Sequence, residues 1–169
     1  MASILKVNTI QDATNSTTAM TIDSSGRVSR SVIPRWKART GPSTSAGYFG
    51  GTDTSTIGAR EVSDPLGNYD ASTRKYTVPI TGSYFIFAQA LHYSSTTGSI
   101  QLRINGSAVS STFGYTYSEG STIGNTTIKL SGYADLTVND AIDIQCTGTN
   151  AWYSNGDDSY TFWGGYFIG

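Results

Sequence analysis

Apolar and polar residues alternate along the middle of this chain with the period of a β-strand. Tyr76, Val78 and Ile80 share one parity and have polar residues or Pro79 between them, so one face of this segment is expected to be buried. Pro79 restricts the segment to a sheet edge or a strand end. The next expected strand has four consecutive apolar residues, Tyr84, Phe85, Ile86 and Phe87. A strand that is apolar on both faces needs two buried surfaces. We expect one to be the core of the domain and the other a copy of the same protein.

Several other segments have the same period of two, and none has the period of a helix. Asn105-Gly106 predicts a hairpin turn, because both central residues of that turn type need positive φ. Polar stretches at 41–45, 55–58 and 150–159 are expected to be loops. The sequence therefore predicts an all-β, antiparallel domain, whose other strands are expected at 36–39, 84–93, 127–130, 142–146 and 162–168.

Residues 1–33 form a separate segment, and Pro34 marks its end. A short strand is expected at 4–10 and a strand, turn and strand at 20–28. So little apolar surface does not support an independent fold, so the segment is expected to wind with two partner chains or to lie on another protein. We predict an attachment arm at 1–33 and a head domain at 34–169. The arm residues expected to make the attachment are Ile4, Leu5, Val7, Ile10, Met20 and Ile22.

The segment from Tyr69 to Phe87 reads Y-D-x-x-T-x-x-Y-T-x-P-x-x-G-x-Y-x-x-F. This pattern resembles the signature of the complement component 1q and tumour-necrosis-factor heads. The similarity continues in three downstream segments, 100–106, 136–142 and 161–169, and covers Trp36 to Gly169. Arg74 and Asn139 stand where the family usually has glycine.

The resemblance implies a ten-stranded jelly roll that assembles as a homotrimer. The closing strand is apolar to its end, so it is expected in the middle of a sheet and against a neighbouring copy. Residues 1–33 are similar to the N-terminal attachment regions of tailed-phage appendages. The residues expected in the core and the trimer interface are Tyr84, Phe85, Ile86, Phe87, Tyr166, Phe167 and Ile168.

Composition fits a β-rich extracellular or virion protein better than a helical enzyme. Charged residues are 14% of the 169 residues, Ser and Thr number 47, and Gly 19; ordinary domains have roughly 25% charged residues. The single cysteine excludes an intrachain disulfide. The N-terminus has no apolar run of the kind found in signal peptides, and no segment approaches the ~20 apolar residues of a membrane span. We expect a protein made in the host cytoplasm and released within a virus particle.

Charge is unevenly distributed along the chain. Residues 1–40 have six cations and two acids, a net charge of +4, whereas residues 41–169 have five cations and ten acids, a net charge of −5. The arm is either a solvated linker or a basic segment that docks on an acidic scaffold. A nucleic-acid partner is disfavoured, because the head is acidic and the cations are not interleaved with stacking aromatics.

No catalytic, cofactor or metal motif stands out. His92 is the only histidine and Cys146 lies on the apolar parity of its strand, so both are interpreted as structural residues. Asp157 and Asp158 have the oxygen ligands that calcium prefers, but their spacing matches no calcium loop. We therefore predict no metal, no cofactor and no catalytic residue.

Aromatic residues in or beside probable loops are candidates for ligand binding. A flat ring stacks on the apolar face of a sugar, and nearby hydroxyls and amides bind its polar edge. Trimer contacts or loop anchors are equally good interpretations of the same residues. The candidates are Tyr115, Tyr117, Trp152 and Tyr153.

The leading hypothesis is a non-enzymatic virion structural protein, a short homotrimeric phage appendage such as a fibre or a capsid decoration. Its arm attaches to another virion protein, and its head projects outward, where it binds host surface glycan or protein or only decorates the particle. One alternative is a bacterial surface or secreted binding module with the same head. Another is a polysaccharide-degrading appendage that uses two carboxylates, for which Asp135, Asp140 and Asp143 are candidates by residue type only.

Overall fold

The computed structural model describes residues 8–11, 18–30, 33–39, 47–49, 55–56, 60–92, 98–109, 116–118, 126–147, 152–154 and 160–169, with backbone alone at 18–19, 29–30, 47–49, 55–56, 60, 98, 116–118, 147 and 152–154. These residues form β-strands and turns, and all pairings among the strands are antiparallel. None of them belongs to a helix that is long and apolar enough to cross a membrane. The chain divides into two compact units, Met1–Ile33 and Pro34–Gly169.

The first unit contains a three-stranded sheet in the order β1 (Thr9–Gln11), β2 (Thr18–Ile22) and β3 (Val28–Arg30). The turn between β2 and β3 is fixed by Asp23, whose carboxylate accepts hydrogen bonds from the backbone N–H of Ser25 and Arg27, both at 2.9 Å. Gly26 has φ +77° in this turn, a conformation that glycine adopts without steric cost.

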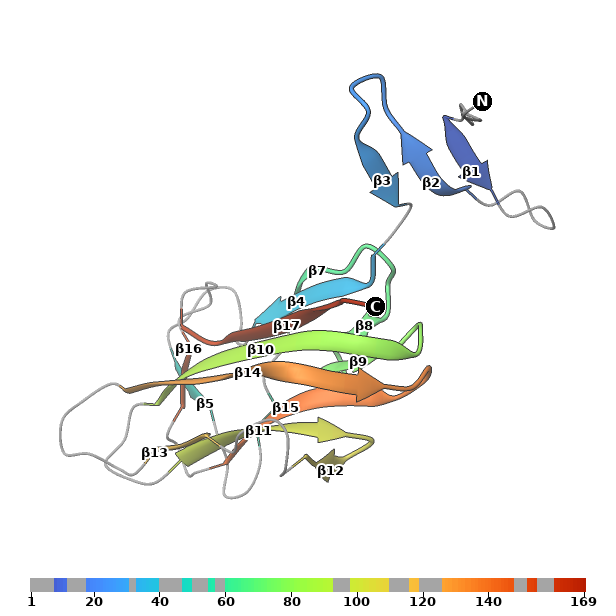
Figure 1. Ribbon diagram of the computed structural model, residues 1–169. Helices are drawn as coiled ribbons and strands as arrows, with labels where there is room; N and C mark the ends of the chain where they lie inside the picture. The colour runs from blue at the N-terminus through green and yellow to red at the C-terminus, as the bar shows by residue number, and fades with distance from the viewer. Residues whose placement is uncertain are drawn as a thin grey trace, which may run out of the picture. The chain divides into compact units, whose positions relative to one another are not determined.

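The second unit, the head, consists of two sheets packed face to face (Figure 1). The β10 sheet has the order β5 (Gly47–Phe49), β16 (Trp152–Ser154), β10 (Gly82–His92), β17 (Phe162–Phe167), β4 (Arg35–Arg39) and β7 (Arg60–Ser63), and β14 (Thr126–Leu136) pairs with the other edge of β10. The β15 sheet has the order β12 (Ser107–Ala108), β11 (Gly98–Ile104), β15 (Ala141–Thr147), β9 (Lys75–Thr77) and β8 (Tyr69–Asp70), with β13 (Thr116–Ser118) on β11 and β6 (Ser55–Thr56) on β15. The predicted all-β, antiparallel class is confirmed. The count of ten strands stays a prediction, because several of these strands have only two or three residues.

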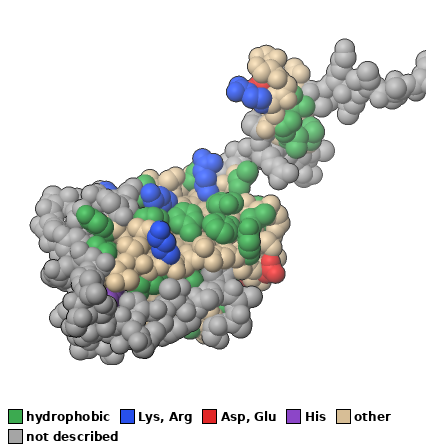
Figure 2. Space-filling view, turned by 60° about the vertical axis from the view of Figure 1, so that its left-hand side comes forward, with side chains coloured by type: hydrophobic (Ala, Val, Ile, Leu, Met, Phe, Trp, Pro, Cys, Tyr) green, Lys and Arg blue, Asp and Glu red, His purple; other side chains and the backbone are tan. Residues whose placement is uncertain are grey.

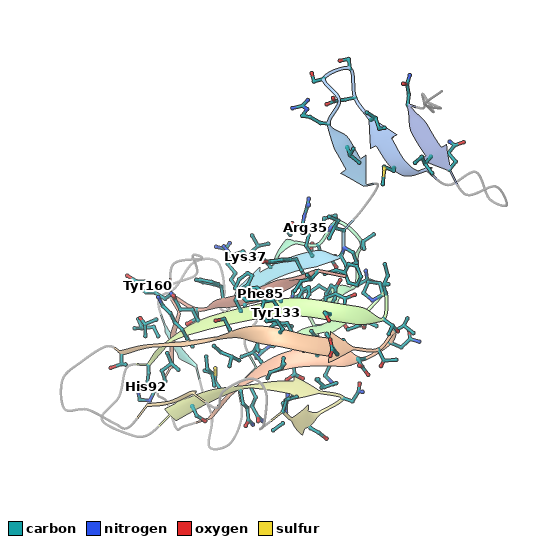
Figure 3. All side chains as sticks on the ribbon, in the orientation of Figure 1. Arg35, Lys37, Phe85, His92, Tyr133 and Tyr160 are labelled. Carbon is teal, nitrogen blue, oxygen red and sulfur yellow. The ribbon has the colours of Figure 1, made fainter. Side chains whose placement is uncertain are left out.

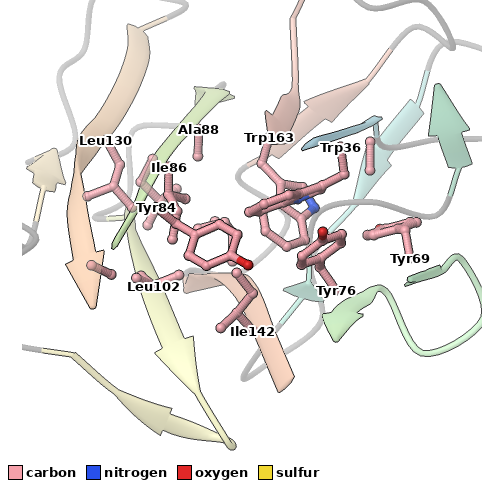
Figure 4. Packing of buried hydrophobic residues seen from close by; sticks show 14 of the residues in the cluster. Trp36, Tyr69, Tyr76, Tyr84, Ile86, Ala88, Leu102, Leu130, Ile142 and Trp163 are labelled. Atoms are coloured by element: carbon pink, nitrogen blue, oxygen red, sulfur yellow. The ribbon is translucent and has the colours of Figure 1, made fainter. Parts of the chain in front are cut away.

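Aromatic side chains fill the space between the two sheets (Figure 4). The Trp36 and Tyr76 rings stack with centroids 3.8 Å apart and planes at 14°, and Trp163 meets Trp36 edge-on at 5.5 Å. Gly165 makes this arrangement possible, because a Cβ at this position would lie 2.5 Å from the Trp36 ring and 2.6 Å from the carbonyl oxygen of Phe85.

The turns agree with the sequence interpretation. Asn105 and Gly106 both have positive φ, +51° and +81°, which confirms the hairpin turn between β11 and β12. Arg74 and Asn139 also have positive φ, +60° and +72°. These are the two positions where the similar family usually has glycine, so the backbone keeps the conformation although the side chain has changed.

Three details differ from the expectation. Ile80 is 47% exposed, because β9 ends before Pro79 and the segment then turns away from the core. The expected loop at 55–58 contains strand β6, and the expected loop at 150–159 contains strand β16. Both strands are short and pair through backbone hydrogen bonds, which the polar side chains around them do not indicate.

The head has two different ends. At the Pro34 end, β4 begins and the register pairs Gly82 with Leu136. The turns at this end hydrogen-bond to one another: the Val78 N–H donates to the carbonyl of Asp140 at 2.9 Å, and the Asn139 N–H donates to the carbonyl of Val78 at 2.8 Å. At the His92 end, β10 meets the start of β14 and strand β16. The arm therefore joins the head at the end that is closed by short turns.

Candidate functional site

The outer face of the β10 sheet exposes a continuous group of aromatic side chains. The register places Tyr133, Phe85 and Tyr166 side by side on three adjacent strands. Tyr133 is 66% exposed and Tyr166 is 46% exposed. We call the group formed by Phe85, Phe87, Tyr133, Phe162 and Tyr166 the aromatic face.

The rings of the aromatic face touch one another as well as solvent. Phe85 lies with its ring centroid 5.3 Å from Tyr133 and 5.5 Å from Tyr166. The ring centroids of Phe87 and Phe162 lie 6.3 Å apart. The Phe85–Tyr133 and Phe87–Phe162 pairs are edge-on, a preferred aromatic geometry, so the rings pack against one another within one chain. The space-filling view shows hydrophobic side chains grouped on one side of the head, with Lys and Arg among them (Figure 2).

Charged side chains border the aromatic face on both edges (Figure 3). Arg35 and Lys37 come from β4, and the Lys37 Nζ lies 5.0 Å from the centroid of the Phe162 ring, within the range of a cation–π contact. On the opposite edge, β14 carries Asp135, whose carboxylate accepts a hydrogen bond from the hydroxyl of Ser83.

The structure divides the residues that were expected in core and interface between two faces. Tyr84 and Ile86 are fully buried in the core, and Phe167 packs against the core from β17. Phe85 and Phe87 alternate with these buried residues on β10 and therefore lie on the outer face. Tyr166 and Ile168 alternate with Phe167 in the same way and are exposed.

Sequence reasoning missed Tyr133 and Phe162, which complete the aromatic face. Tyr133 lies on the polar parity of β14, where an isolated aromatic residue carries no signal of its own. Only the register with Phe85 shows that the two rings meet. The sequence pattern of β14 alone does not show which strand it pairs with, so it could not place Tyr133 beside Phe85.

The arm sheet also has an apolar face. Ile10 pairs with Met20, and Ile22 pairs with Val28, so these four side chains share one face. Thr9 and Thr21 occupy the other face. Ile10 is 47% and Val28 57% exposed. Ile10, Met20 and Ile22 are predicted attachment residues, whereas the predicted residues Ile4, Leu5 and Val7 lie outside the described residues.

Three of the four predicted ligand-binding residues have their backbone at the His92 end. Tyr117 lies in β13, which pairs with the start of β11, and Trp152 and Tyr153 lie in β16, which pairs with the end of β10. They lie in short strands and not in loops, and their side chains are outside the described part of the chain. Tyr115 lies outside it entirely.

The residues of chemical interest are engaged in structural roles. Cys146 is buried, and its burial raises the pKa of the thiol well above the ordinary value, as the structural interpretation expected. His92 is also buried, which lowers its pKa. The described residues contain no group of three or more His, Cys, Asp or Glu arranged for a metal ion, and Asp157 and Asp158 lie outside those residues.

The three carboxylates considered for hydrolysis each have a structural partner. Asp143 is fully buried, and its Oδ1 accepts a hydrogen bond from the Arg103 Nε at 2.6 Å. Asp140 accepts one from the backbone N–H of Thr137 at 2.8 Å. Asp135 lies on the β10 sheet, whereas Asp143 lies on the β15 sheet.

Comparison with known proteins identifies the fold. Over 81% of this chain and 100% of the other, the structure is similar to murine APRIL, with a TM-score of 0.62 and 15% sequence identity. The globular domain of zebrafish complement 1qA gives a TM-score of 0.56 at 16% identity, over 80% of this chain and 98% of that one. Eiger TNF from S. frugiperda gives 0.60 at 14% identity, over 81% and 93%.

No protein-family model matches the sequence, and no curated protein matches it. The structural similarity defines the head as a jelly roll of the tumour-necrosis-factor and complement 1q type. At this level of identity the likeness shows the fold, which agrees with the family resemblance of the sequence.

Proposed function

We propose that this protein is a non-enzymatic virion structural protein, a short homotrimeric phage appendage such as a fibre or a capsid decoration. Its arm attaches to another virion protein, and its head projects outward. The observation that carries the homotrimer in this proposal is the aromatic face, an apolar surface on the outside of a jelly-roll sheet.

Homotrimerisation covers this face. Large contiguous apolar patches on soluble proteins mark interaction sites, and aromatic residues are enriched at the centres of interfaces. The heads that the sequence resembles are homotrimers. Of the seven residues expected in the core and the trimer interface, Phe85, Phe87, Tyr166 and Ile168 have the outward parity, so we assign these four to the subunit contact. Tyr133 and Phe162 join them in the proposed interface.

The arm provides the attachment. Its three-stranded sheet leaves Ile10, Met20, Ile22 and Val28 on one exposed face, and a small sheet with one apolar face gains stability when that face is covered. The excess of cations in residues 1–40 favours an acidic scaffold. Ile4, Leu5 and Val7 extend the proposed contact.

The His92 end is then the outward end of the head. We choose this end because β4 follows the arm in the sequence, begins at the Pro34 end and runs towards the His92 end of the head. Tyr117, Trp152 and Tyr153 lie at that end and are the proposed contacts with host surface glycan or protein, together with Tyr115. Three heads per appendage would raise the avidity of weak contacts without strengthening any one of them.

An enzymatic function has less support. A polysaccharide-degrading site needs two carboxylates facing a common cleft, whereas Asp135 and Asp143 lie on different sheets and Asp140 and Asp143 hold a turn and an ion pair. The proposed virion location is supported by the apolar face of the arm and by the resemblance of residues 1–33 to phage attachment regions, and it would place synthesis in the host cytoplasm.

The molar mass of the full chain in solution tests the homotrimer. For the wild type we expect the molar mass of a trimer. For Phe85→Asp, which places a charge in the middle of the aromatic face, we expect the mass of a monomer or a dimer. Leu66→Asp is the matched control, since Leu66 is 37% exposed in the turn before β8. A wild type that stays monomeric at micromolar concentration contradicts the proposal.

The virion role needs a separate test. Labelled protein should bind purified particles that lack it, and Met20→Asp with Ile22→Asp should abolish the binding while leaving the trimer mass unchanged. Binding to bacterial cells through the arm, with none to particles, would favour a bacterial surface module instead.

A further inference from the structure

We propose that Arg35 of one copy inserts between Tyr133 and Asp135 of the next copy and thereby sets the head-to-tail order of the trimer. This inference rests on the homotrimer proposed above, and it names the residues that specify how neighbouring copies are arranged.

Arg35 lies at one edge of the aromatic face, and Tyr133 and Asp135 lie at the other. The register gives a row across four strands, from Arg35 on β4 through Tyr166 and Phe85 to Tyr133 on β14. Four strands spaced about 4.8 Å apart put the ends of this row about 14 Å from each other. That separation is beyond the reach of an arginine side chain, so Arg35 does not meet Tyr133 within one chain.

The Arg35 side chain is exposed, and no ion pair of Arg35 is formed among the residues that the structure describes. The guanidinium is therefore available to a neighbour. Arginine suits an interface that offers a ring and a carboxylate together, because its planar group stacks on aromatic faces and binds carboxylates through two N–H groups.

The opposite edge offers this combination. Tyr133 and Asp135 are two residues apart on β14, so they point to the same face about 7 Å apart. The Tyr133 ring is 66% exposed. The Ser83 hydroxyl donates to one oxygen of the Asp135 carboxylate, which orients the carboxylate and leaves its other oxygen for a second donor.

A contact between opposite edges of one face is heterologous, and it closes into a ring when the rotation between copies allows it. The charge pattern agrees with this order: the β4 edge carries the cation Arg35, and the β14 edge carries the acid Asp135 at the same end of the head. Two β14 edges placed side by side in the same direction would instead bring two Asp135 carboxylates together.

Charge reversal in the full chain tests the pairing. Sedimentation over a range of concentrations should show that Arg35→Glu raises the concentration of half-dissociation by about tenfold or more, because repulsion at three contacts replaces attraction. Asp135→Arg should act in the same direction. The double variant R35E/D135R restores opposite charges with reversed polarity, and we expect it to return to within about threefold of wild type.

Lys75→Glu is the matched control, since it makes the same charge change on the β15 sheet. Circular dichroism of every variant shows whether the β-fold is intact. If the wild type is trimeric and Arg35→Glu has the same concentration of half-dissociation as Lys75→Glu, the pairing is overturned and the homotrimer is not. Failure of the double variant to recover also overturns the pairing, whereas a monomeric wild type overturns the homotrimer and the pairing together.

Discussion

Gly165 is the position at which one added methyl group should do the most damage to the head. In Gly165→Ala the new Cβ would lie 2.5 Å from Cη2 of Trp36, 2.9 Å from its Cζ2 and 2.6 Å from the carbonyl oxygen of Phe85. The carbonyl belongs to the central strand β10. The indole is held by stacking on Tyr76 at 3.8 Å and by the edge of Trp163 at 5.5 Å. Neither neighbour is the flexible end of a side chain, so the clash is relieved only by separating β17 from β10 or by displacing the stack.

Overpacking of a core costs about 1–3 kcal/mol, and occasionally more. With two rigid neighbours we expect the upper part of that range, about 3 kcal/mol of unfolding free energy. For a domain of this size that corresponds to a decrease in Tm of about 10 °C. Urea denaturation followed by tryptophan fluorescence measures the change, at one fixed protein concentration because assembly adds to the stability.

Gly169→Ala is the matched control, since a Cβ there would meet nothing within 4 Å. We expect it to unfold with wild-type stability. A change of about 0.5 kcal/mol or less in unfolding free energy is usual for a neutral surface substitution. If Gly165→Ala changes it by no more than that, Trp36 does not pack across β17 and the described core is wrong.

Three further predictions concern charged and reactive groups. Arg103→Ala should lower the unfolding free energy by about 3 kcal/mol, because it leaves the buried Asp143 carboxylate without its cation. Replacing both residues in R103M/D143L should lower it by less in the same urea assay. An equal or larger loss in the double variant would contradict this reason. Hydrogen bonds, first of all from the Ser72 hydroxyl, lower the pKa of Asp70 to about 2 from 3.8, so the stabilisation is present above pH 3.8 and is lost as the pH falls towards 2. Carboxyl NMR should show that midpoint, and Ser72→Ala should raise it. Cys146 should not react with a thiol reagent at pH 8 in the native protein and should react with one equivalent after denaturation, because its thiol is buried and its pKa raised; rapid native labelling would show that the strand opens.

Much of the head could be predicted because period-two alternation reports burial directly. Strand β10 buries one parity, with Tyr84 and Ile86 in the core, and Asn105-Gly106 forms its hairpin, since both signals are local. Strand β16 could not be predicted in the same way, because its pairing with β5 and β10 depends on backbone groups and not on an apolar pattern.

Part of the candidate site could be seen in the sequence. Phe85 and Phe87 stood out within the four consecutive apolar residues of β10. Tyr133 is a single aromatic residue on its strand, and Phe162 lies in the apolar closing strand without having been singled out. Both become part of the same face only through strand register. For the same reason the sequence did not show that Val28 completes the apolar side of the arm sheet, since its partner Ile22 is set by the β2–β3 pairing.

The unequal ends of the head have a practical consequence for protein engineering. The hydrogen bonds between Val78, Asn139 and Asp140 tie two turns together at the Pro34 end, so a foreign peptide inserted in either turn would break them. Peptide display on this head should therefore avoid residues 78–81 and 137–140, where an insertion would separate two turns that hold each other.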